Sequence, residues 1–174
     1  MANMMNISNR RWVVMGVSGC GKSDIGQRLA TALGVPFIEG DLWHSPASVT
    51  KMAAGIPLTD DDRAAWLATL RDQIAAAQAS GAGMVLSCSA LKRRYRDVLR
   101  EGDPDLFFVE LDGPRALIEE RMHARKGHFM PPSLLDSQFR DLAPLQADER
   151  GLRVQITGTP AAIMQTILAE VSGR

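Results

Sequence analysis

A glycine-rich turn near the start of the chain constrains the fold more than any other segment. The turn reads Gly16-Val-Ser-Gly-Cys-Gly-Lys-Ser23 and matches the phosphate-binding pattern G-x-x-x-x-G-K-[ST]. Residues 12–15 precede it as a short apolar run, which predicts a buried strand, and residues 24–33 carry apolar side chains at four-residue spacing, which predicts a helix. A strand, a glycine-rich turn and a helix N-terminus in this order direct backbone N–H groups at phosphate. The sequence therefore predicts a site for a nucleoside triphosphate.

The residue types in this loop have separate chemical roles. We expect Lys22 to reach the β- and γ-phosphates as a catalytic cation, and the Ser23 hydroxyl to hold Mg²⁺. The loop residues expected to bind phosphate are Gly16, Ser18, Gly19, Cys20, Gly21, Lys22 and Ser23. A helix N-terminus lowers the pKa of a thiol, so Cys20 could be reactive. The motif accepts many residues at that position, however, and this favours a small side chain that fills the loop.

Composition and charge limit the class of protein. The 174 residues suffice for one α/β domain that buries its own core. Lys plus Arg equals Asp plus Glu, at 20 each, so no global field favours nucleic acid or an anionic membrane. Residues 1–9 are polar and are expected to form a flexible tail, and no segment approaches the ~20 apolar residues of a membrane span. The two cysteines do not suggest a disulfide framework. We expect a cytoplasmic protein without a nucleic-acid or membrane partner.

Short apolar runs alternate with amphipathic stretches along the whole chain, as in α/β proteins with a parallel sheet. The expected strands are residues 12–15, 35–38, 84–86, 106–111 and 152–156. A long helix is expected after Thr59, which has capping-box spacing to Asp62. Two segments interrupt the alternation, and these are residues 44–62 and about 125–133. They are the places for a substrate-binding flap and an ATP-covering lid in a single phosphate-loop domain of residues 1–174.

Acidic residues at strand ends are the candidates for proton transfer and metal binding, because ligands bind beyond the carboxyl ends of parallel strands. Asp41 ends the second strand and could orient a substrate hydroxyl, accept its proton and hold Mg²⁺ through water. It could instead only cap the next segment. The third strand ends without an acid at Ser87, so the metal depends on Ser23 and Asp41, with Asp112 as the competing acid. His44 is either a substrate contact or a surface residue.

Clustered cations are the candidates for binding an anionic substrate. Lys92 opens a basic stretch, residues 92–96, at an expected helix start, where cations oppose the helix dipole and are therefore not explained by helix stability. At least one of these charges is expected to bind an anion, and Asp97 and Glu101 are expected to pair with others. Arg63 and Lys51 are further candidates for a cationic anchor.

Arg121 and Arg125 lie four residues apart and lead into the expected lid. Arginines on a lid stabilise a transferring phosphoryl group, an effect of ~10³ to 10⁵ in rate when the arginine is supplied in trans. Helical salt bridges do not explain Arg121, because its neighbours at three and four residues include no acid, although Asp136 could pair with it from elsewhere. Thr159-Pro160 opens the last helix and is placed to contact the adenine with its backbone.

Several blocks together resemble the gluconokinases of the thermoresistant type. The blocks run in order from about residue 12 to residue 150. They are Met15-Gly-Val-Ser-Gly-Cys-Gly-Lys-Ser, Glu39-Gly-Asp-Leu-Trp-His, Lys51-Met52, Gly55-Ile-Pro-Leu-Thr-Asp-Asp-Asp-Arg63, Trp66-Leu67, Cys88-Ser-Ala-Leu-Lys92, Tyr95-Arg96, Ala124-Arg-Lys-Gly-His-Phe129 and Ser137-Gln-Phe139. The resemblance implies ATP- and Mg²⁺-dependent phosphorylation of D-gluconate on its 6-hydroxyl, with ADP as the second product. It also implies a homodimer and a three-layer fold like that of shikimate and nucleoside monophosphate kinases, with strand order 2-3-1-4-5.

Lys22, Asp41 and Arg125 are the expected catalytic residues, and the block Ala124–Phe129 adds His128 to the substrate-binding candidates. The chain departs from the family at Ala143, where a glutamate is usual, so any role of that glutamate is in question here. A shikimate-type or nucleoside monophosphate kinase is the nearest alternative. A GTPase switch is disfavoured, because its guanine-reading Asn-Lys-x-Asp requires an asparagine and none occurs after Asn9.

Overall fold

The computed structural model describes residues 7–124 and 132–172, and its centre is a parallel sheet of five strands. The strands are β1 (Arg11–Met15), β2 (Phe37–Glu39), β3 (Met84–Ser87), β4 (Phe107–Asp112) and β5 (Gly151–Gln155). Their order across the sheet is β2-β3-β1-β4-β5, so the order that the resemblance implied is confirmed.

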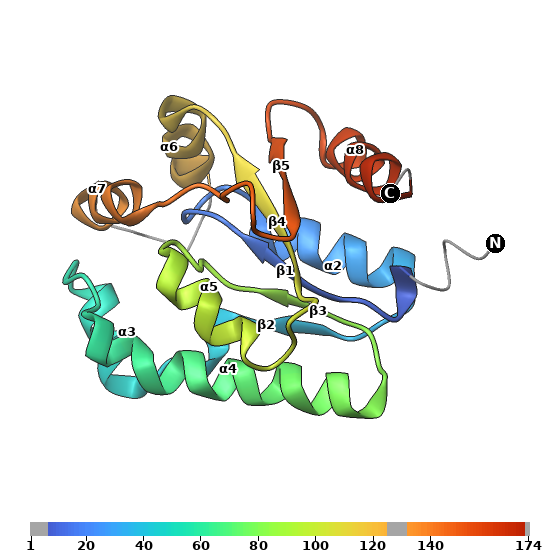
Figure 1. Cartoon of the computed structure of the whole chain (residues 1–174). Helices are drawn as coiled ribbons and strands as arrows, with labels where there is room; N and C mark the ends of the chain where they lie inside the picture. Colours follow the sequence, from blue (N-terminus) through green and yellow to red (C-terminus); the bar gives the residue numbers. More distant parts are fainter. Residues whose placement is uncertain (1–6, 125–131, 173–174) are drawn as a thin grey trace.

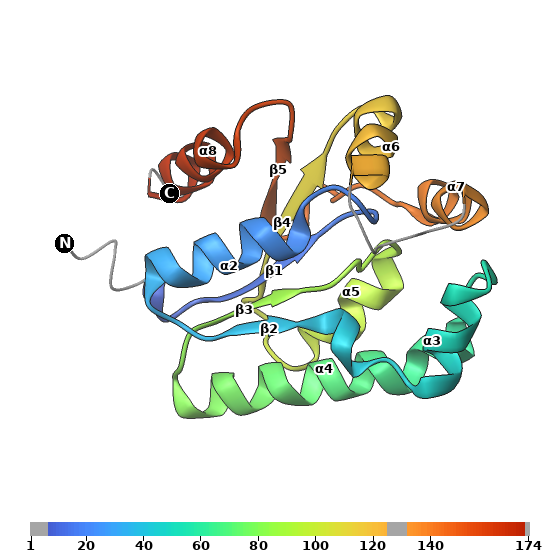
Figure 2. The same ribbon diagram turned by 180° about the vertical axis from the view of Figure 1, so that it is seen from behind.

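Helices cover both faces of the sheet and make the three expected layers. Figures 1 and 2 show α2 (Lys22–Leu33) and α8 (Pro160–Ser172) on one face, and α4 (Asp60–Ser80) and α5 (Arg93–Arg100) on the other. The short helical turn η1 (Gly40–Trp43) and the helices α3 (Pro46–Ala53), α6 (Arg115–Ala124) and α7 (Pro132–Asp141) gather near the end where β1 and β4 finish. The small helix expected in the flap segment is α3.

The central strand shows why the sheet needs two helical layers. In β1, Trp12 and Val14 pack into the core under α2 and α8, while Val13 and Met15 pack into the core under α4 and α5. All four side chains are fully buried. A strand that is apolar on both faces is typical of a parallel sheet covered on each side.

Helix α4 begins and ends as its sequence predicts. The Thr59 hydroxyl accepts the Asp62 N–H at 3.1 Å, and the Asp62 carboxylate accepts the Thr59 N–H at 2.9 Å, which completes the capping box. Gly81 ends the helix in the left-handed conformation. The buried stripe of α4 is the predicted set Trp66, Leu67, Leu70 and Ile74. No helix among the described residues has the length and apolar character that crossing a membrane requires.

Candidate active site

The phosphate loop joins β1 to α2 at the carboxyl end of the sheet. Gly21 precedes α2 with a φ of 97°, a conformation that a side chain disfavours, and so the helix can start directly at Lys22. The Lys22 ammonium is buried and donates to the carbonyl of Val17 at 3.0 Å. Gln138 of α7 accepts the Ser18 N–H at 2.7 Å and donates to the Ser18 hydroxyl at 3.1 Å. Residues 120 positions apart in the sequence thus meet at the loop.

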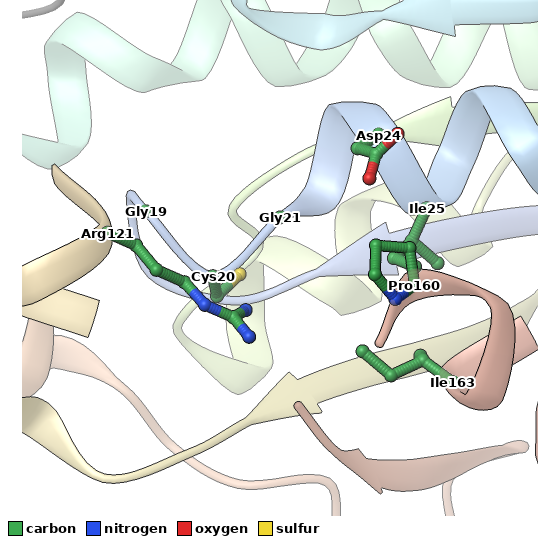
Figure 3. Close-up of a pocket in the computed structure, with 8 residues that line it drawn as sticks. All are labelled: Gly19, Cys20, Gly21, Asp24, Ile25, Arg121, Pro160 and Ile163. Carbon is green, nitrogen blue, oxygen red and sulfur yellow. The ribbon is translucent and has the colours of Figure 1, made fainter. Parts of the chain in front are cut away.

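A cavity of about 330 Å³ opens beside the loop. It is lined by Gly19, Cys20, Gly21, Asp24, Ile25, Arg121, Pro160 and Ile163. Figure 3 shows Arg121 reaching from α6 past Gly19 and Cys20, with Pro160 on the opposite side. Arg121 also donates to the carbonyl of Ile156 at 2.7 Å, which orients the guanidinium. The loop, the arginine and the start of α8 therefore meet around one cavity.

The contacts of Cys20, Thr159 and Asp136 bear on three of the predictions for this region. Burial raises the pKa of the Cys20 thiol, outweighing the opposing effect of Lys22, so the filler interpretation is favoured over the reactive one. The Thr159 hydroxyl accepts the Ala162 N–H at 3.1 Å and so caps α8, while the expected contact with adenine involves the backbone and not this oxygen. Asp136 pairs with Arg115 and not with Arg121.

The third strand, β3, ends without an acidic residue, but the carboxylate of Glu39 lies beside Ser23. Glu39, at the end of β2, accepts hydrogen bonds from the hydroxyls of Ser23 and of Ser87, the latter at 2.5 Å. The parallel register places Glu39 directly opposite Ser87. Gly40 makes this approach possible, because a Cβ there would lie 2.2 Å from the carbonyl oxygen of Ser87. Glu39 thus supplies the acid from the neighbouring strand.

Asp41 lies in η1, with 63% of its side chain exposed, and faces His44 at 3.8 Å between Oδ1 and Nε2. The His44 ring is only 5% exposed and stacks on Trp66 at 4.0 Å between ring centroids, so it is not a surface residue. Burial lowers the pKa of His44, against the opposing effect of Asp41, which favours the neutral imidazole. Trp66 in turn donates to the carbonyl of Gly40 at 2.8 Å and fixes the start of η1.

The other acid, Asp112, contacts Arg153 and Gln155 of β5, each at 3.0 Å. It therefore has partners on the far edge of the sheet, whereas Glu39 contacts Ser23 directly. Among Glu39, Asp41 and Asp112, Glu39 is the acid for which a hydrogen bond to Ser23 is found.

Two of the expected anchor cations lie close together. Arg63 of α4 donates to the Tyr95 hydroxyl at 3.0 Å, and Lys92 donates to Asp60 at 3.3 Å. The carboxylate of Asp141, the last residue of α7, lies 3.9 Å from Arg63 and 4.0 Å from Lys92. A substrate carboxylate could therefore contact both cations.

Lys51 is not part of this pair. It binds Asp62 at 2.8 Å, and this hydrogen bond is the main reason why the pKa of Asp62 falls to about 2. The contact ties α3 to the first turn of α4. Lys51 thus holds the flap segment in the described structure.

The remaining charges of the basic stretch are paired. Arg93 binds Asp97 as expected, and also Asp148, whereas Glu101 binds Arg71 outside the stretch. Arg94 pairs with Asp60, and the buried Arg96 pairs with Glu149. Lys92 also contacts Asp60, at 3.3 Å, but it is the member of the stretch that lies with Arg63 beside Asp141, and it therefore best fits an anion site.

Arg125, His128 and most of the expected lid lie outside the described residues. Sequence reasoning missed Glu39, Gln138 and Asp141. A signal for Glu39 was present in the sequence. Glu39 is an acid at the end of the second strand, and the third strand, with which the second pairs, ends without one. Gln138 and Asp141 depend on where α7 packs, which no local pattern reveals.

Comparison with known proteins identifies the family. Residues 12–145 match the model described as AAA domain. A gluconokinase from Gluconobacter oxydans is 45% identical over 94% of this chain and 92% of its own length. The thermoresistant gluconokinase of Escherichia coli is 44% identical over 86% of this chain and 85% of its own length.

A solved structure agrees with these relatives. The crystal structure of a gluconokinase from Sinorhizobium meliloti has a TM-score of 0.86 and 48% sequence identity, and the match covers 94% of this chain and 92% of that one. Identity at this level, over most of each chain and together with a shared fold, leads to one conclusion: the chain belongs to the gluconokinase family.

Proposed function

We propose that this protein transfers the γ-phosphoryl group of ATP to the 6-hydroxyl of D-gluconate, giving 6-phospho-D-gluconate and ADP. The observation that carries the proposal is the pair of cations, Arg63 and Lys92, held 3.9 and 4.0 Å from a single carboxylate group in a gluconokinase-family fold. This arrangement matches an acceptor that carries a carboxylate. Arginine and lysine are also the residues that bind carboxylates most strongly.

Recognition of the acceptor combines charge with hydrogen bonds. Arg63 and Lys92 bind the carboxylate, with Lys51 and His128 as further candidates from the flap and the lid. The neutral His44 ring offers a buried Nδ1 for which no hydrogen-bond partner is found among the described residues, and it therefore suits a substrate hydroxyl. Sites built from buried polar groups discriminate strongly against substrates that lack the matching hydroxyl.

Asp41 orients the 6-hydroxyl and accepts its proton as the oxygen attacks the γ-phosphate in line. Lys22, Arg121 and Arg125 stabilise the negative charge on the transferring group. The backbone N–H groups of residues 16–23, at the start of α2, cradle the phosphates. Pro160, at the start of α8, lines the opposite wall of the nucleotide cavity, and the backbone of Thr159-Pro160 contacts the adenine there.

The residues around Ser23 fit Mg²⁺. No three His, Cys, Asp or Glu side chains cluster as metal ligands within residues 7–124 and 132–172. This ion does not need such a cluster, because it keeps several waters and binds one or two carboxylates plus substrate phosphates. Ser23 and Glu39 would hold it, with Asp41 contacting it through water. When bound, the ion neutralises charge on the β- and γ-phosphates.

Two further proposals follow, the first from the family resemblance and the second from the two free cysteines, Cys20 and Cys88. The protein is a homodimer, which light scattering coupled to size-exclusion chromatography tests, and it works in the cytoplasm.

A coupled assay of ADP release tests the function. Gluconate, shikimate and the nucleoside monophosphates are supplied in turn with ATP and Mg²⁺, and the product is identified by phosphorus NMR. We expect turnover with gluconate and a phosphomonoester on carbon 6. Turnover confined to shikimate or a nucleotide would instead favour the alternative kinases, and tight GTP binding without any acceptor would favour a switch.

A further inference from the structure

Asp141 occupies an unusual place for an acid. It is the last residue of α7, and an acid at a helix C-terminus is opposed by the helix dipole. Its two carboxylate oxygens face cations from two other elements, with Oδ2 toward Arg63 of α4 and Oδ1 toward Lys92 before α5. Helix stability therefore does not explain the residue, whereas the two cations do.

The contacts of Asp141 are electrostatic rather than hydrogen-bonded. Both distances, 3.9 and 4.0 Å, exceed the range of a hydrogen bond. The side chains of Asp141, Arg63 and Lys92 are 26%, 12% and 29% exposed, so the group is partly shielded yet reachable from solvent. The carboxylate of a substrate could form short hydrogen bonds to Arg63 and Lys92, whereas Asp141 forms none with them.

We infer that Asp141 is a specificity-determining residue, an internal carboxylate that competes with the acceptor's carboxylate for Arg63 and Lys92. This inference rests on the proposed function. Asp60, which Lys92 also contacts at 3.3 Å, pairs with Arg94 as well. Counted together, the cations Arg63, Lys92 and Arg94 and the carboxylates Asp60 and Asp141 leave one net positive charge. One carboxylate matches that charge. Asp141 therefore limits the affinity for gluconate and the charge that the site accepts.

The Asp141→Asn variant tests this inference, because it removes the charge and keeps the size. Two charges about 4 Å apart in water interact by enough to change an affinity about fivefold. We expect the gluconate KM and the gluconate Kd from titration calorimetry to fall about fivefold in dilute buffer. The gain should shrink near 1 M salt, where the Debye length is about 3 Å. The KM for ATP should not change.

Sorbitol separates charge from shape, because it has the hydroxyls of gluconate without the carboxylate. Its inhibition constant should be the same in the wild type and in Asp141→Asn. Asp136→Asn is the matched control, since Asp136 lies on the same helix and pairs with Arg115 instead. It should leave the gluconate KM at the wild-type value. Thermal melting of each variant verifies the fold.

The outcomes are distinguishable. A wild-type protein that neither binds nor phosphorylates gluconate refutes the proposed function, and with it the inference. A wild-type protein that is active, with a gluconate KM that is unchanged or higher in Asp141→Asn, refutes the inference alone. A higher KM would mean that Asp141 holds the two cations in place for the substrate and does not compete with it.

Discussion

A buried ion pair behind the acceptor site leads to a quantitative prediction. The side chains of Arg96 and Glu149 are both fully buried, and they bind through two hydrogen bonds at 2.7 and 3.0 Å. Burial alone would raise the pKa of Glu149, but the hydrogen bonds from Arg96, the Gln146 N–H and Arg100 lower it from 4.5 to about 2. This shift corresponds to about 3 kcal/mol of folding free energy.

Glu149→Gln should therefore lower the free energy of unfolding by about 3 kcal/mol near pH 7, because it leaves the buried Arg96 charge uncompensated. The folded-state pKa is depressed, so this stabilisation is complete above about pH 4.5 and disappears as the pH falls through about 2. The difference between wild type and variant should fall below half of its value near pH 3. Urea unfolding followed by circular dichroism at several pH values measures it.

The pair also supports the acceptor site. Arg96 donates to the carbonyls of Ala90 and Leu91 at 2.9 and 3.2 Å, and Ala90 has a left-handed φ of 45°, which a side chain disfavours. Lys92 follows directly, so Glu149→Gln should raise the gluconate KM more than the ATP KM.

Asp148→Asn is the control, because Asp148 is 68% exposed and its contact with Arg93 should contribute at most about 1 kcal/mol. The reasoning fails if Glu149→Gln costs less than this control, or if its cost is the same near pH 3 as near pH 7.

Three further predictions concern the metal site, the base and the two thiols. Glu39→Gln should raise the Mg²⁺ concentration needed for half-maximal activity about 10- to 100-fold, because Ser23 loses its carboxylate partner. A titration of activity against Mg²⁺ with an unchanged midpoint would contradict this role of Glu39. Asp41→Asn should lower kcat by orders of magnitude while ATP still binds in calorimetry, and near-normal turnover would exclude Asp41 as the base. Cys20 and Cys88 are buried, and burial raises the pKa of Cys88 to about 12, so iodoacetamide near pH 8 should label the protein only after denaturation. Rapid labelling of the folded protein would revive the reactive-thiol interpretation.

The elements that local patterns encode were predictable. The capping box at Thr59, the apolar stripe of α4 and the alternation of strands and helices depend on residues that are neighbours in the sequence. The phosphate loop is equally local. These patterns, with the family resemblance, were sufficient for the strand order and the fold class.

The contacts that bring distant elements together were not predictable in the same way. Asp41 ends a run and was the acid expected beside Ser23, but the strand ends two residues earlier, and its register directs Glu39 at Ser87 and Ser23. The partners of Arg94 and Arg96 lie 34 and 53 residues away, so the helical spacing that suggested Asp97 and Glu101 could not find them. Asp141 of α7 likewise faces Arg63 and Lys92, which belong to parts of the chain far from it in the sequence.

Strand β2 is the shortest strand of the sheet, lies at its edge, and pairs with β3 alone through three residue pairs. A slip of one residue would turn Glu39 to the opposite face of the sheet. Short edge strands open locally at a lower free energy than the core does. Loss of activity in mild denaturant should therefore begin with fraying of this edge, while the rest of the molecule is still folded.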